Sequence, residues 1–177
     1  AALRTAGLDV VGFGAPRNSV TPELRDHLVS QGVRYDGSLA FDPMLSYVDP
    51  SMHVDPTDPR RSMVVIPFIV PNDWDALRVM GVSPERMLAM WLERVDRLAS
   101  MHESVAVLDV HQWLASDDAE LAVLRSFIRT IAARGDCRIM TLRDAAAHAG
   151  EAIRAGERAA NASLDRVTSP LRAEASR

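Results

Sequence analysis

The chain alternates short apolar runs with longer amphipathic segments, a pattern that predicts alternating strands and helices. The most strand-like run extends from Met63 to Val70 and contains no polar side chain. Alternation of this kind favours an α/β protein with a largely parallel sheet. Four further runs are typical of strands, at residues 8–13, 33–36, 105–110 and 138–142.

Helix-start signals stand between these runs. Thr21 fits an N-cap with Pro22 at the first helical position, which predicts a helix that ends at Gly32. Ser83-Pro84-Glu85 predicts the start of a second helix, whose apolar residues recur at helical spacing. Two more helices are predicted over residues 117–133 and 144–160.

Residues 41–61 are rich in Asp and Pro without a clear period, which predicts a long surface loop. His53 lies in this loop. It has no partner at ligand spacing, so we expect its side chain to be solvated.

Composition narrows the function classes. The net charge of −4 gives no indication of a nucleic-acid or membrane-surface partner, and no apolar run is long enough to span a bilayer. One cysteine, Cys137, excludes an internal disulfide and a cysteine-based zinc site. The chain starts at Ala1 and not at methionine, which suggests a processed product, a fragment or a domain of a longer chain. The compartment therefore stays open.

Three predicted strand ends carry side chains suited to chemistry. In a parallel sheet the carboxyl ends of the strands meet at one edge, so residues 14–18, 71–75 and 111–113 are expected to converge. They offer a basic group, carboxylates, a histidine and two indoles. Indole faces stack on sugar rings and carboxylates bind hydroxyl groups, so the set fits a carbohydrate pocket.

Two of these residues have a second interpretation. His111 ends the run 105–110, where barrel enzymes place catalytic groups, and imidazole exchanges a proton readily near neutral pH. His111 could equally have a structural role, in which it caps a strand and forms a hydrogen bond with a loop. Asp73 could be the N-cap of a helix over residues 73–80.

Five motifs, in the same order along the chain, resemble those of the polysaccharide deacetylase domain, the family 4 carbohydrate esterases. The resemblance covers nearly all of residues 1–150 and corresponds to the C-terminal portion of that domain. The matching segments are Phe13-Gly14-Ala15-Pro16 (the Arg-x-Pro loop), GVRYDGS at 32–38 (a Gly-Tyr-x-Tyr-Asp-Ser-Ser strand), Asp73-Trp74 (the groove motif), Leu108-Asp109-Val110-His111 (the histidine motif) and MTLRDAA at 140–146 (the closing strand and helix).

The resemblance implies a partial, distorted (β/α) barrel of about five parallel strands with flanking helices. Residues 1–150 would form the C-terminal portion of the barrel domain, and residues 151–177 a polar C-terminal helix or tail.

The resemblance also implies a hydrolase that removes acetyl or similar acyl groups from amino sugars or related carbohydrates. A divalent metal, usually zinc, would activate water and polarise the carbonyl. His111 would protonate the leaving group, Arg17 would orient the catalytic base, and backbone groups near Pro16-Arg17 would help to hold the oxyanion. The implied substrate-binding residues are Pro16, Asp73, Trp74, Leu108, Val110 and Trp113, with Leu108 or Val110 walling the acyl pocket.

The chain departs from the family in two respects. Gly14 stands where the family usually has arginine, with Arg17 shifted from that position, and the chain has neither the Asp-Asp strand nor the His-x-x-x-His motif. No metal ligand set can be assembled from it, so the metal and the catalytic base lie on a missing N-terminal segment or do not exist, and we expect the chain alone to be inactive. Without the first strands the sheet has an unpaired edge, which predicts binding of that segment or self-association.

Two alternatives remain. The chain could be a non-catalytic carbohydrate-binding or interaction domain derived from the same barrel. It could also be an unrelated α/β domain whose strand-end residues coincide with the motifs.

Overall fold

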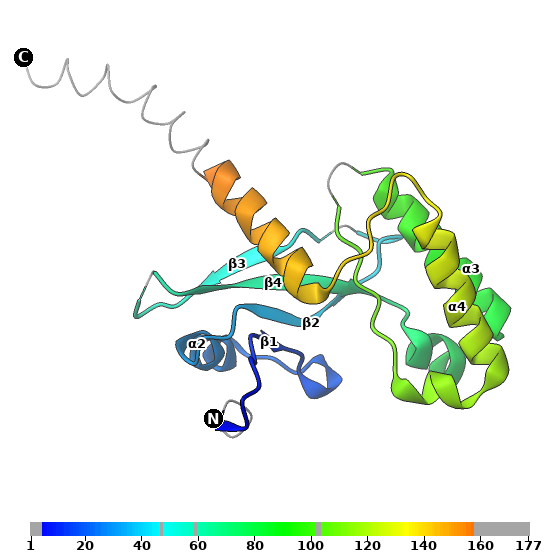
Figure 1. Ribbon diagram of the computed structural model, residues 1–177, viewed down its shortest axis with the longest axis horizontal. Helices are drawn as coiled ribbons and strands as arrows, with labels where there is room; N and C mark the ends of the chain where they lie inside the picture. The colour runs from blue at the N-terminus through cyan, green and yellow to red at the C-terminus, as the bar shows by residue number, and fades with distance from the viewer. Residues whose placement is uncertain (1–4, 47, 59, 102–103, 158–177) are drawn as a thin grey trace, which may run out of the picture.

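The computed structural model describes residues 5–46, 48–58, 60–101 and 104–157, and its centre is a four-stranded sheet (Figure 1). The strands lie in the order β1 (Gly12–Phe13), β2 (Tyr35–Phe41), β4 (Ser62–Ile69) and β3 (Ser51–Val54). β1, β2 and β4 are parallel, whereas β3 is antiparallel to β4. The described residues thus form a mixed sheet.

β4 is buried on both faces, which explains why its sequence is continuously apolar. Met63 packs against Val29 and Val33, which lie in and just after helix α2 (Pro22–Ser30). On the opposite face, Val64 and Ile66 pack against alanines of a helix over residues 142–157. Figure 1 shows this helix and α2 on opposite sides of the sheet.

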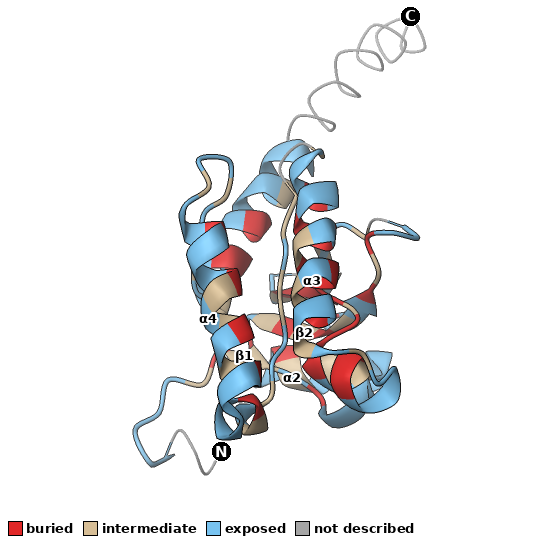
Figure 2. Ribbon diagram, turned by 90° about the vertical axis from the view of Figure 1, so that its right-hand side faces the viewer, coloured by how far each residue is buried: buried red, intermediate tan, exposed pale blue. Residues whose placement is uncertain are grey.

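A second core lies beyond the carboxyl ends of the strands, between α3 (Pro84–Ala99) and α4 (Asp118–Ala132) (Figure 1). Trp91 is fully buried and meets Phe127 edge to face, with ring centroids 5.5 Å apart. Figure 2 shows buried positions recurring along both helices while other positions on them are exposed. Between the two cores, the buried ends of β2 and β4, at Phe41 and Ile69, pack against Leu98 of α3.

The predicted helices agree with the structure to within a few residues. Ser83 and Asp117 are N-caps whose side chains accept backbone N–H groups at the starts of α3 and α4. The helix predicted from residue 144 begins at 142, and residues 158–177 lie outside the described part of the chain. The division at residue 150 stays a prediction.

The prediction of about five parallel strands is wrong for the described residues. Residues 138–142 form no ladder there, although Met140 and Leu142 pack on β4. Residues 105–110 are not a regular strand either; Ile69 donates one backbone hydrogen bond to the Val107 carbonyl, at 2.8 Å. β3 pairs with β4 over residues 62–65, so this part of the β4 edge is closed to a further parallel strand.

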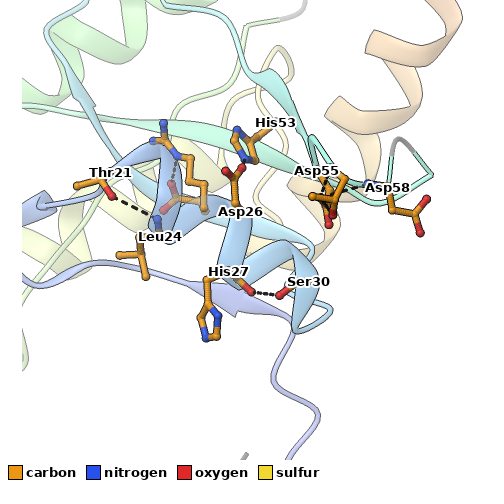
Figure 3. Close-up of polar contacts among 11 residues, drawn as sticks. Thr21, Leu24, Asp26, His27, Ser30, His53, Asp55 and Asp58 are labelled. Atoms are coloured by element: carbon orange, nitrogen blue, oxygen red, sulfur yellow. Dashed lines mark hydrogen bonds and ion pairs between the residues drawn. The ribbon is translucent and has the colours of Figure 1, made fainter.

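β3 lies within the segment predicted to be an irregular loop, and its contacts explain the error. His53 Nε2 lies 2.8 Å from the Asp26 carboxylate, so β3 is tied to α2 and His53 is not simply solvated (Figure 3). The neighbouring His27 side chain points away from this pair in the same view. A contact between residues so far apart in the sequence leaves no local pattern to detect.

Asp55 closes the turn between β3 and β4. Its carboxylate accepts hydrogen bonds from the Thr57 hydroxyl at 2.7 Å and the Thr57 backbone N–H at 2.8 Å. These bonds, the hydroxyl first, lower the pKa of Asp55. They form an Asx turn in which the ionised carboxylate is a stronger acceptor than the neutral acid.

We expect the Asp55→Asn variant to be less stable than the parent chain at neutral pH and to approach it in acid. Because the folded pKa lies below the unfolded value of about 3.9, the contribution of Asp55 is complete above that value and disappears as the pH falls through the folded pKa. Urea unfolding midpoints between pH 7 and pH 3 measure the difference, with the exposed Asp49→Asn as a control. A gap between parent and D55N that does not narrow in acid would contradict this assignment.

Cys137 is partly buried against the core between α3 and α4. Burial raises the pKa of its thiol, so the thiolate is disfavoured at neutral pH. Cys137 therefore packs as a core residue.

None of the helices in the described ranges has both the length and the apolar character that crossing a bilayer requires.

Candidate active site

The site lies where β4 runs into the turn before Asp73, and α3 holds this turn in place. The indole N–H of Trp91 donates to the Pro71 carbonyl at 3.1 Å. Arg94 donates to the Val70 carbonyl at 2.7 Å, and its guanidinium lies 2.7 Å from the Asp42 carboxylate. Two buried side chains of one helix thus fix the backbone that delivers Asp73.

Asn72, and not Asp73, caps the helical turn that follows. The Asp75 N–H donates to the Asn72 side chain at 2.9 Å, and the Asn72 N–H donates to the Asp75 carboxylate at 3.2 Å. This reciprocal pair opens η2 (Asp75–Val79), a single π-helical turn in which the Met80 N–H bonds to the Asp75 carbonyl. The interpretation of Asp73 as a helix cap is therefore wrong, and its carboxylate is available for another partner.

That partner is His111, which Asp73 holds by both carboxylate oxygens. One oxygen lies 2.8 Å from His111 Nδ1, and the other accepts the His111 backbone N–H at 2.9 Å. Asp73 is fully buried, whereas 40% of the His111 side chain is exposed. Because an ionised carboxylate only accepts hydrogen bonds, Nδ1 carries the hydrogen and Nε2 is left to exchange a proton with a ligand.

Two indole rings surround the imidazole. Trp113 stacks on His111 with centroids 5.8 Å apart and an interplanar angle of 25°. Trp74 is tilted against His111 at 6.4 Å and meets Trp113 at 6.4 Å, edge to face. Half of Trp74 is exposed, so an apolar face stands beside the histidine and remains open to a ligand.

Arg78 and Glu120 complete this group of side chains, and neither was predicted from the sequence. The guanidinium of Arg78 lies 4.3 Å over the Trp113 ring, and its Nη2 lies 2.9 Å from the Glu120 carboxylate. A cleft of about 350 Å³ opens here, lined by Trp74, Arg78, Trp113, Ser116, Asp117 and Glu120. The Arg78–Glu120 contact spans 42 positions, so no spacing rule could have revealed it.

The other residues implied by the motif resemblance are less closely tied to His111. Leu108 is half-buried and packs against the core between α3 and α4 and against the strand ends, while Val110 is partly exposed next to His111. Their role in an acyl pocket stays a prediction.

Pro16 and Arg17 lie on the exposed short helix η1 (Pro16–Asn18), where Arg17 has φ = 54°. The Ala15 N–H donates to the Ser38 hydroxyl at 2.8 Å, which anchors this loop to β2. Across residues 5–157, gaps aside, no hydrogen bond or ion pair joins Arg17 to Asp73 or His111. The segments at residues 71–75 and 111–113 are therefore in direct contact. The convergence of residues 14–18 with them stays a prediction.

The described residues contain no group of three His, Cys, Asp or Glu side chains that could hold a metal ion. They therefore do not fit the divalent metal that the motif resemblance implies.

Comparison with known proteins supports the fold. No protein-family model matches the chain, and no curated protein matches it. Among solved structures, it is similar to a Mycobacterium smegmatis protein provisionally named a polysaccharide deacetylase, with a TM-score of 0.67 and 22% sequence identity. The similarity covers 84% of this chain and 52% of that protein, so the chain spans about half of its length. The resemblance seen in the motifs is thus confirmed at the level of the fold, which this chain shares with a protein named as a polysaccharide deacetylase.

Proposed function

We propose that the chain is part of a hydrolase that removes acetyl or similar acyl groups from amino sugars or related carbohydrates. The observation that carries the proposal is the buried Asp73 carboxylate, which fixes both the backbone and the ring of a half-exposed histidine. A histidine held in one tautomer beside open aromatic surface is suited to general acid catalysis on a ring-shaped substrate. The shared fold is consistent with this chemistry.

In this proposal His111 donates the proton from Nε2 to the leaving nitrogen or oxygen as the acyl bond breaks. Asp73 stays ionised and stabilises the protonated imidazole that precedes this step. Trp74 and Trp113 contact the sugar, and Leu108 or Val110 faces the acyl methyl group. Arg17 and the backbone near Pro16 are proposed to support the catalytic base and the oxyanion.

The described side chains do not fit a divalent metal such as zinc. In this proposal, residues outside the described part of the chain would bind it. β1 is the terminal strand of the sheet, and a further segment of the gene product or a second copy of the chain could pair along it. We propose that such a segment supplies the metal ligands and that this chain alone is inactive.

A non-catalytic carbohydrate-binding domain is the second candidate. The observation that favours it is the open cleft beside Trp74 and Trp113, which could bind a sugar without any chemistry.

One experiment separates the two. The gene upstream of Ala1 is read for an Asp-Asp strand and a His-x-x-x-His motif, and the complete gene product is loaded with zinc and incubated with N-acetylated oligosaccharides. The hydrolase predicts acetate release that a chelator abolishes. Sugar binding without acetate release, in a gene product that lacks the metal motifs, would favour the binding domain. If the gene product shows neither sugar binding nor acetate release, both candidate functions are overturned.

A further inference from the structure

We propose that Asp36 and Ser38 are positioning residues, which hold the loop of Pro16 and Arg17 in the conformation that the proposed reaction uses. This inference rests on the proposed function, in which Arg17 supports the catalytic base. It concerns two buried residues to which that function gives no role.

Asp36 is a fully buried carboxylate on β2. Arg25 of α2 donates from its Nε to one of the Asp36 oxygens, at 2.9 Å. The other oxygen accepts the Ser38 backbone N–H at 3.0 Å and the Ser38 hydroxyl. Arg25 thus balances the charge of Asp36, and the second carboxylate oxygen is used entirely for Ser38.

The hydroxyl group of Ser38 can act in one direction only. Because a carboxylate accepts hydrogen bonds and cannot donate them, the hydroxyl hydrogen points to Asp36 and the hydroxyl oxygen is left to accept. The Ala15 N–H donates to this oxygen at 2.8 Å. Ser38 is buried, so the low local dielectric strengthens the bond and water does not compete for it.

This hydrogen bond lies just beyond the end of β1. The parallel pairing of β1 with β2 ends where Phe13 lies opposite Asp36. Ala15 follows Phe13 by two residues, as Ser38 follows Asp36, and side chains two apart on a strand point to the same face. The Ala15 N–H therefore meets a side chain where the strand ladder no longer provides a partner.

The loop after Ala15 has a strained backbone that needs such an anchor. Arg17 and Asn18 have φ values of 54° and 56°, and within the described ranges they are the two non-glycine residues with positive φ. Residues with a Cβ keep this conformation only where their surroundings determine it, and such strain is concentrated at functional sites. The Asn18 N–H closes the turn on the Ala15 carbonyl at 3.0 Å. Since the ring of Pro16 fixes its own φ, few rotatable bonds separate the anchored Ala15 from Arg17.

Stability alone does not account for this group of buried polar residues. Phe13 and α2 already pack on the sheet through apolar side chains around Val29 and Met63. A buried charge in a hydrogen-bonded network contributes little net stability, but it can select one conformation over others. Here the conformation that it selects is that of the exposed loop that carries Arg17.

The test measures steady-state acetate release by the complete gene product that carries Ser38→Ala. Alanine removes the acceptor of the Ala15 N–H, so we expect kcat to fall about tenfold or more while KM changes little. Ser38→Thr keeps a hydroxyl group and should restore most of the activity. The losses caused by S38A and Arg17→Gln should not multiply in the double variant, because both act through the same loop.

Ser83→Ala is the matched control, because the Ser83 hydroxyl also accepts a backbone N–H but lies at the start of α3. Hydrogen exchange of residues 15–19, followed by mass spectrometry, is a readout that does not depend on acetate release. We expect S38A to speed this exchange about tenfold and S83A to leave it unchanged. Ser38→Cys offers a weaker acceptor in a side chain of similar shape, so it replaces S38A if the alanine variant does not fold.

Turnover in S38A equal to that of the parent, or losses from S38A and R17Q that multiply in full, would overturn the positioning role. Loop exchange that neither S38A nor S38C changes would overturn it as well. If the parent gene product releases no acetate, the hydrolase proposal is overturned, and the loop exchange alone decides whether Ser38 holds this loop.

Discussion

Replacing His111 with glutamine is expected to lower the rate of acyl-group release by about 10²-fold or more in the complete gene product. Glutamine cannot supply a proton at neutral pH, while it keeps a polar side chain of similar size between the two indoles. The measurement is acetate release under saturating substrate. Sugar binding should change little, because the tryptophans that contact the ring are retained.

His148→Gln is the matched control, since this histidine is exposed on the helix over residues 142–157. Asp73→Asn tests the same proton donation by changing the hydrogen-bond partner of His111. It keeps the size of the buried side chain but cannot hold a protonated imidazole as a carboxylate does, so it should lower acetate release with a smaller effect on binding. Turnover in H111Q equal to that of the parent enzyme would remove His111 from the mechanism.

Trp91→Ala is expected to cost about 3–5 kcal/mol of folding free energy, the largest loss that we predict for a single core position. Trp91 is fully buried, meets Phe127 edge to face, and donates its indole N–H to the Pro71 carbonyl. Alanine would leave a cavity between α3 and α4 and an unpaired carbonyl two residues before Asp73. Urea unfolding monitored by circular dichroism measures the loss.

Two variants control this prediction. Trp91→Phe keeps an aromatic ring and removes the N–H donor, so it should be clearly milder than the alanine variant. Trp74→Ala removes a tryptophan that is half exposed and should barely change stability, although it should weaken sugar binding. A loss below about 1 kcal/mol for W91A would show that the core between the two helices is not organised by this indole.

Helix boundaries could be predicted from the sequence because their signals are local. The Ser83-Pro84 and Asp117-Asp118 pairs place a cap and the first helical residue side by side, and α3 and α4 start there. Strand pairing is different, since residues 105–110 have a suitable composition but β3 occupies part of the β4 edge. The contacts that stabilise β3, such as His53 with Asp26, join distant positions.

The same distinction holds for the site. Asp73 and His111 do approach each other, as the expected convergence of strand ends implied, but residues 105–110 deliver His111 without forming a regular strand. The Asn72-x-x-Asp75 pair is a local capping signal that could have excluded Asp73 as the helix cap. Arg78 and Glu120 meet because η2 and α4 both pack into the core around Trp91, a placement that no local pattern encodes.

The two hydrogen bonds between the Asp73 carboxylate and His111 have a further consequence, which concerns preorganisation of the site. Because one carboxylate binds both the backbone and the ring, the rotamer freedom of the histidine is lost when the chain folds and not when a substrate arrives. Ligand binding therefore has less ordering entropy to overcome at this position. The alignment of His111 is a property of the folded chain itself, so a chain with this fold would keep an aligned imidazole whether or not its partner groups for catalysis are present.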